Sequence, residues 1–100
     1  MSEIKKAVAA VPSVEVDDGH IRVTRWHFEP GASTGMHVHE FDYLVVPVTG
    51  GEFIVNNAEG LSTSMIQQPG ECYKRQAGVM HNVISNSPRA MNFVEIEFLV

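Results

Sequence analysis

The sequence predicts an all-β fold, built as a small antiparallel sandwich or β-barrel. From Val14 onward, short apolar or alternating segments recur roughly every 8–12 residues, separated by turn signals such as Pro30-Gly31 and Pro69-Gly70. Signals for helices are scarce. The chain has 100 residues, of which 44% are hydrophobic and 19% charged, as expected for one folded globular domain.

The first segment is the exception to the β pattern. EIKKAVAAV, residues 3–11, has the composition for about two helical turns before Pro12 stops them. A flexible arm, or an extended strand packed on a partner, fits the same residues. We therefore expect an N-terminal arm or short helix over residues 1–13 and a β-domain over residues 14–100.

Each later segment is bounded by its own turn signal. Residues 20–28 alternate in polarity, and residues 43–49 form an apolar run that ends at Gly50-Gly51. The complete set of expected strands is 20–28, 36–41, 43–49, 52–57, 61–67, 71–76, 80–86 and 90–100.

Alternation assigns faces to two of these strands. In the first, Thr24, Trp26 and Phe28 are expected to face the interior. In the last, we expect the interior face to carry Val94, Ile96 and Phe98, and the solvent face to carry Phe93, Glu95 and Glu97.

Charge and cysteine content exclude several classes of function. Twelve acidic residues against seven Lys and Arg give a net charge of −5, which argues against nucleic acid or an anionic membrane as a partner. The apolar run before Pro12 is too short for a signal sequence or a membrane span. Cys72 is the single cysteine, so no internal disulfide forms, and a cytoplasmic location is the simplest expectation.

His37 and His39 are the first candidates for chemistry. Residues two apart on a strand point the same way, and two imidazoles at that spacing can share one ion. Alone, an H-x-H pair is more often a surface or hydrogen-bonded pair than a metal site. Here Gly31 and Gly35 precede it, and a third histidine follows in GVMHNV, residues 78–83.

Two motifs resemble those of the cupin superfamily. In the first, Gly31 is followed by five residues and then by H-x-H. In the second, Gly70 is followed by Gln76 in place of the usual Pro, and then by Gly78 and His81; the slot for Asn falls on Ser85.

The resemblance covers about residues 21–100 and implies a double-stranded β-helix, the cupin jelly roll, with His37, His39 and His81 as metal ligands inside a barrel. The chain is also similar to small cupins associated with β-alanine breakdown.

Tyr43 occupies the position where most cupins carry a ligating Glu. The site would then hold three neutral imidazoles and open positions, a pattern typical of catalytic sites. The Tyr43 hydroxyl either contacts a metal-bound substrate, as a catalytic residue, or bonds to a carbonyl while the ring fills the barrel. Simple alternation turns Asp42 away from the ligands, which makes it a poor substitute for the missing Glu.

The sequence supports a functional role less strongly for several other residues. Trp26, Phe28 and Phe41 are candidates for the wall of a substrate pocket, although the first two are equally expected in the core. Cys72 is expected in a strand, buried and inert. We find no Arg or Lys that the predicted phases turn inward, so the metal itself would have to bind an anionic substrate.

Three functions remain open. Cupins with three-histidine sites resemble non-haem iron dioxygenases that act on thiol carboxylates or β-dicarbonyls, so we expect such an enzyme with a small-molecule substrate. A non-catalytic metal- or ligand-binding module and a cupin with a structural metal are the alternatives. Three histidines do not select the ion: iron is favoured, with zinc, nickel, manganese and copper as alternatives. By resemblance, the protein is expected to form a homodimer.

Overall fold

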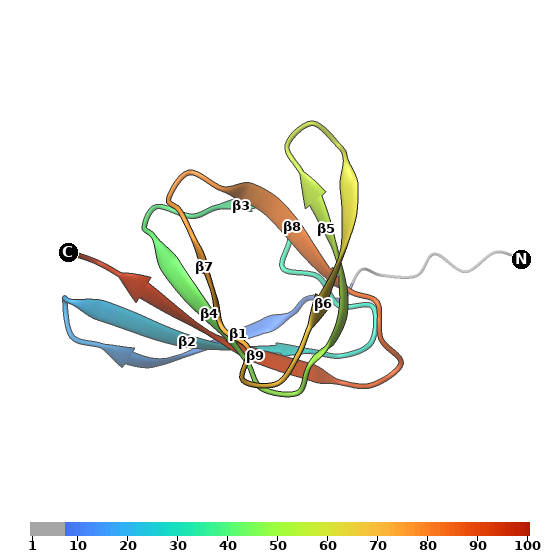
Figure 1. Ribbon diagram of the computed structural model, residues 1–100, viewed down its shortest axis with the longest axis horizontal. Helices are drawn as coiled ribbons and strands as arrows, with labels where there is room; N and C mark the ends of the chain where they lie inside the picture. Colours follow the sequence, from blue (N-terminus) through green and yellow to red (C-terminus); the bar gives the residue numbers. More distant parts are fainter. Residues whose placement is uncertain (1–7) are drawn as a thin grey trace, which may run out of the picture.

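The computed structural model describes residues 8–100, and all regular structure in this range is β (Figure 1). The strands are β1 Val11–Asp17, β2 Ile21–Phe28, β3 His37–Val38, β4 Tyr43–Pro47, β5 Gly51–Asn57, β6 Ser62–Gln67, β7 Tyr73–Arg75, β8 Met80–Ser85 and β9 Met91–Phe98. The predicted all-β class is confirmed. No helix in the described range has the length and apolar character needed to cross a membrane.

Two antiparallel sheets enclose the interior (Figure 1). The five-stranded sheet has the order β1-β2-β9-β4-β7, and the four-stranded sheet has the order β3-β8-β5-β6. The long central strand β9 pairs with β2 over its whole length, from Ile21↔Phe98 to Phe28↔Met91, and with β4 on its other side. This double pairing makes β9 the strand that fixes the register of the larger sheet.

The predicted N-terminal helix lies largely outside the described residues. Its described end is not helical, because Ala9 bridges Ser33 and β1 begins at Val11. From there β1 pairs with β2, so the residues on both sides of the predicted boundary at 13 belong to one strand.

Three phenylalanines form the centre of the core. Phe28, Phe53 and Phe93 are 0%, 0% and 4% exposed. Their ring centroids lie 5.0, 5.4 and 5.6 Å apart, within the range for favourable aromatic pairs. The inward face predicted for β2 is correct, since Thr24 and Phe28 are buried and Trp26 packs against the core.

The phase predicted for the last strand is wrong. Phe93 and Glu95 are buried, at 4% and 7% exposure, whereas Phe98 is 38% exposed. The residues of β9 do alternate between the two faces of the sheet, but the more apolar face is not the buried one. The interior here changes from a hydrocarbon core at one end of β9 to a polar cavity at the other, so carboxylates face inward.

Cross-strand rows explain this change in polarity, because directly opposed residues share a face of the sheet. One row joins Pro47, Phe93 and Trp26 and is apolar. The next joins Tyr73, Val45, Glu95 and Thr24, and the third joins Arg75, Tyr43, Glu97 and Arg22. The third row therefore brings four polar side chains to one end of the interior.

Gly51 is required by both backbone and packing. It has φ +123°, and a Cβ there would lie 2.2 Å from Met91 Sδ and 3.0 Å from Ser87 Oγ. Met91 is itself 2% exposed and has little room to move.

We predict that Gly51→Ala lowers the free energy of unfolding by about 2–4 kcal/mol, through backbone strain and overpacking together. Gly60→Ala is the matched control, because Gly60 has φ +82° with nothing within 4 Å of a Cβ. It should lose only about 1–2 kcal/mol from strain. Urea unfolding measures both, and equal losses would refute the packing argument.

Candidate metal centre

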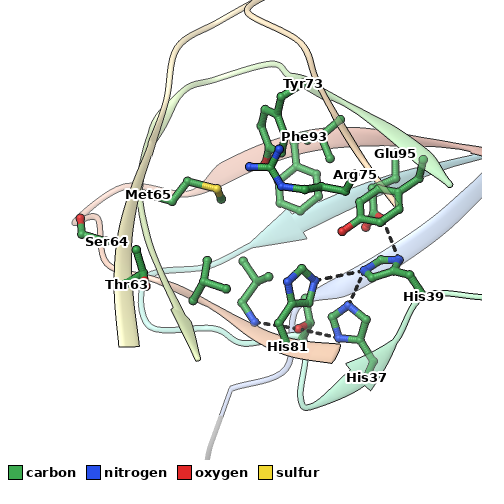
Figure 2. A pocket seen from close by; sticks show the side chains of 15 residues that line it. His37, His39, Thr63, Ser64, Met65, Tyr73, Arg75, His81, Phe93 and Glu95 are labelled. Carbon is green, nitrogen blue, oxygen red and sulfur yellow. Dashed lines mark hydrogen bonds and ion pairs between the residues drawn. The ribbon is translucent and has the colours of Figure 1, made fainter. Parts of the chain in front are cut away.

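Three histidines converge from two places in the four-stranded sheet (Figure 2). His37 on β3 lies directly opposite His81 on β8. His39 follows β3, and its backbone is held beside β8 by bonds from His39 N to Val79 O, 3.0 Å, and from Gly78 N to His39 O, 2.8 Å. Strand pairing thus brings together residues that are distant in sequence.

The ring nitrogens are spaced as ligands of one ion. His39 Nε2 lies 3.0 Å from His37 Nε2 and 3.1 Å from His81 Nε2. Ligands at about 2.1 Å from a metal lie about 3.0 Å apart at a right angle and about 3.4 Å apart at a tetrahedral angle. A ring nitrogen carries one hydrogen or one lone pair, so His39 Nε2 cannot satisfy both neighbours as a hydrogen-bonding partner. A cation between the rings satisfies all three lone pairs.

The far side of the His37 ring is fixed by the backbone. Its Nδ1 donates to the carbonyl of Gly35 at 2.8 Å and lies 3.2 Å from Thr34 Oγ1. Thr34 Oγ1 in turn accepts a hydrogen bond from Val83 N at 3.1 Å. A proton on Nδ1 leaves the Nε2 lone pair free, which is the tautomer that a metal requires.

His39 is held by one ring and one carboxyl group. It stacks on Tyr43 with ring centroids 3.9 Å apart, and its Nδ1 lies 3.7 Å from Glu95 Oε2. The second distance is longer than a hydrogen bond. It does place a carboxyl group beside Nδ1 of His39, while the convergence of the rings is at Nε2, so Glu95 is not part of the ligand cluster.

Burial keeps two of the imidazoles neutral. It lowers the pKa of His39 from 6.5 to about 4, and the charge of His37 acts in the same direction. Burial also lowers the pKa of His81 to about 4, with smaller contributions from His37, His39 and Arg75. At neutral pH these two nitrogens therefore carry lone pairs, and no proton has to be displaced when an ion binds.

Glu95 was missed as a site residue because its strand was assigned the wrong face. Burial raises the pKa of its carboxyl group from 4.5 to about 7, the charge of Glu97 adds to this, and a hydrogen bond from Trp26 opposes it. A row analysis of the β4–β9–β2 register would have found it; hydrophobicity alone gives no signal.

A cavity of about 360 Å³ adjoins the histidines. Its walls combine apolar side chains, among them Val45, Val55 and Met65, with the polar groups of Tyr43 and Arg75. A second cavity, of about 290 Å³, lies against His37 and His39 and is lined by Trp26, Arg22 and Glu97. Glu95 lines both cavities.

Tyr43 faces the first cavity and is 2% exposed. Burial raises the pKa of its phenol, so it stays protonated. Its hydroxyl oxygen is buried without a hydrogen-bond partner among the described residues. Since a buried hydroxyl usually has a partner, this donor is left unsatisfied by the described residues.

The remaining candidates fall outside the ligand cluster. Phe28 is in the core, and Phe41 lines neither cavity, so of the three predicted wall residues Trp26 alone lines one. Asp42 Oδ1 accepts a hydrogen bond from Ala77 N at 2.8 Å, away from the cluster. Cys72 was expected to be buried and is exposed instead, before β7 rather than in it.

Glu95 and the histidines give opposite pH dependences. Between pH 4.5 and 7 the native Glu95 keeps a proton that the unfolded chain releases, so its contribution lowers stability as pH rises. Between pH 4 and 6.5 the unfolded chain binds protons that native His39 and His81 do not, so the contribution of these two histidines raises stability as pH rises.

We predict that Glu95→Gln removes the contribution of Glu95, which lowers stability as pH rises. Metal-free Glu95→Gln should gain stability more steeply than wild type from pH 4.5 to 6.5, and should exceed wild type at about pH 8, where wild type buries a charge. Urea midpoints of chelator-treated protein measure this, with Glu59→Gln, in an exposed turn, as control. Parallel curves for Glu95→Gln and wild type would contradict the assignment.

Similarity to known proteins agrees with the geometry. No model of a protein family matches the sequence. The chain is 47% identical over 88 residues to the β-alanine degradation protein BauB of Pseudomonas aeruginosa, covering 88% of this chain and 92% of that one. The crystal structure of a cupin domain from Bordetella pertussis Tohama I superposes with a TM-score of 0.90 at 42% identity, over 94% of this chain and 97% of that one.

A more distant structure shares the fold alone. The polyketide cyclase RemF from Streptomyces resistomycificus matches with a TM-score of 0.69 at 18% identity, over 98% of this chain and 72% of that one. Two close relatives, a shared jelly-roll architecture and the three-histidine cluster lead to one conclusion. The chain belongs to the cupin superfamily, in the same family as BauB.

Proposed function

We propose that this cupin is a metal-dependent enzyme of the non-haem iron dioxygenase type, acting on a small organic acid or dicarbonyl. The observation that carries the proposal is the meeting of three imidazoles beside one cavity, next to a tyrosine whose buried hydroxyl has no partner among the described residues. A structural ion is usually enclosed by four protein ligands, whereas this cluster has three and adjoins open volume. That contrast favours an enzyme over a structural metal.

A bound iron(II) ion would supply the capacity to bind a chelating substrate and to activate dioxygen. The chain's own residues do the rest. His37, His39 and His81 would hold the ion, the Gly35 carbonyl orients the His37 ring, and the His39 ring stacks on Tyr43. The apolar part of the wall limits the water that accompanies a bound substrate.

Tyr43 is the proposed catalytic residue. Its hydroxyl is protonated, because burial raises the phenol pKa, and it stacks against the ring of His39. It would donate a hydrogen bond to a substrate oxygen as negative charge develops there. No part of this role requires the phenol to lose its proton.

The general proposal is tested by oxygen uptake. Iron-loaded protein should consume dioxygen with at least one member of a panel of thiol carboxylates and β-diketones. With ¹⁸O₂ both labelled atoms should appear in the products, together in the oxidised thiol carboxylate or divided between the two cleavage products of a β-diketone, as a dioxygenase requires. If no panel member consumes dioxygen and chelation melts the barrel, the structural-metal alternative replaces the proposal.

We predict that Tyr43→Phe lowers the turnover rate about 100-fold while the metal content stays unchanged, since one preorganised donor is lost. Tyr73→Phe is the matched control: Tyr73 lines the same cavity, but its hydroxyl already accepts a hydrogen bond from Gln67 Nε2 at 2.7 Å. It should change the rate much less. Full activity in Tyr43→Phe would leave Tyr43 with a packing role only.

The metabolic setting follows from the named relative. BauB is named for β-alanine degradation, and we propose the same setting for this chain. We also propose a cytoplasmic location, which suits the exposed thiol of Cys72.

We further propose that the protein is a homodimer formed along β1. This strand is an edge of the five-stranded sheet, and it exposes Val11, Val14 and Val16 to 55%, 61% and 42%. An exposed apolar edge strand is a template for pairing with another chain.

Sedimentation velocity should give about twice the chain mass of 11.0 kDa for wild type. Val14→Lys should shift the protein to monomer, because it puts a charge on the edge. Leu61→Lys, which changes a residue 66% exposed outside β1, should remain dimeric. A monomeric wild type at all concentrations would rule out this interface.

A further inference from the structure

Arg75 is a solvent-exposed cationic residue whose side chain also lines the histidine cavity. It ends β7 and lies directly opposite Tyr43 on β4, and opposed residues share a face of the sheet. Both side chains line the same cavity, and Figure 2 shows Arg75 among the side chains around it. The expectation that no Arg or Lys faces inward is therefore wrong. The sequence pattern of residues 71–76 does not show which of their side chains face the interior.

The charge of Arg75 has no carboxylate partner among residues 8–100. Its neighbours in the cross-strand row are already paired: Arg22 Nε and Nη2 donate to Glu97 at 2.9 and 3.1 Å. Arg25 pairs with Glu15 at 2.9 Å, and Glu95 lies against His39. The carboxylates near this end of the sheet therefore have other contacts.

The contacts that Arg75 does make leave most of its donors available. Nη1 donates to the Lys74 carbonyl at 3.0 Å, and the guanidinium carbon lies 4.5 Å from the centroid of the Tyr73 ring. A guanidinium has five N–H donors in a planar fork that matches a carboxylate. The contact with the face of the Tyr73 ring uses none of these N–H donors.

The wall of the cavity then carries two positive charges once an ion is bound. Neutral imidazoles do not cancel the charge of a divalent cation, and Arg75 adds another. The apolar side chains of Val45, Val83 and Met65 line the same cavity. Such a cavity attracts an anion with a short apolar middle.

We propose that Arg75 binds the carboxylate of a substrate whose other end chelates the ion at His37, His39 and His81. This inference rests on the proposed function for the chelating end and adds the carboxylate site. The substrate class is an oxygen- or sulfur-chelating small molecule that carries a carboxylate separated from the chelating atoms by a short carbon chain. Arg75 is the residue that would favour this substrate over the same chelating molecule without the carboxylate.

The test is a binding cycle on zinc-loaded protein, in which no turnover interferes. The two probes are 2,4-pentanedione, a neutral β-diketone, and 4,6-dioxoheptanoate, the same chelating group with a carboxylate added. Titration calorimetry should show wild type binding the carboxylate about 10- to 100-fold more tightly, as expected for charge-assisted hydrogen bonds.

Arg75→Gln should abolish this preference while leaving the affinity for 2,4-pentanedione unchanged. Lys74→Gln is the matched control: it removes the same charge from the adjacent residue, whose Nζ lies 5.9 Å from the Phe98 ring centroid outside the cavity. It should keep the preference. Circular dichroism and melting curves should be alike for the two variants.

A preference that survives Arg75→Gln, an equal loss of affinity for both probes, or no binding of either probe to zinc-loaded wild type would overturn the inference. The proposed function fails separately. If the preference depends on Arg75 and iron-loaded protein consumes no dioxygen, the carboxylate site stands and the oxygenase proposal falls. If iron-loaded protein consumes dioxygen but shows no preference for the carboxylate probe, the oxygenase proposal stands and the carboxylate site falls.

Discussion

The convergence of three imidazoles depends on one short piece of strand pairing. His37 on β3 is the register partner of His81 on β8, and the two hydrogen bonds between His39 and the segment 78–79 hold the third ring beside them. The resulting Nε2 separations of 3.0 and 3.1 Å are those of ligands that share one cation. A shift of one residue in this register would turn the rings to the other face.

The larger sheet provides the surroundings that this arrangement needs. Its apolar row at Phe93 belongs to the aromatic core, while the next two rows place Glu95, Tyr43 and Arg75 around the histidines. Burying Glu95 and Tyr43 costs free energy, because each loses contact with water. The Tyr43 hydroxyl has no hydrogen-bond partner among the described residues. Arg75 stays exposed while its side chain lines the cavity.

Much of the fold could be predicted from the sequence, because turns and alternation are local properties. Eight of the nine strands, the inward face of β2 and the cupin resemblance needed no tertiary information, whereas β1 was not among the expected strands. The face of β9 could not be predicted, since Val94 and Ile96 are more apolar than Glu95 and Glu97, and the pattern gives no sign that the interior becomes polar. Arg75 was missed for a related reason: a three-residue strand has too few positions to establish a phase, and its direction is set by pairing with Tyr43.

The central claim is that His37, His39 and His81 ligate one metal ion. The most direct measurement is the anomalous diffraction of a crystal grown with iron(II) under anaerobic conditions. The account predicts one peak about 2.0–2.2 Å from all three Nε2 atoms, with Glu95 remaining outside the ligand sphere. A peak ligated by other groups, or no peak while the His81 ring points out of the cavity, would contradict it.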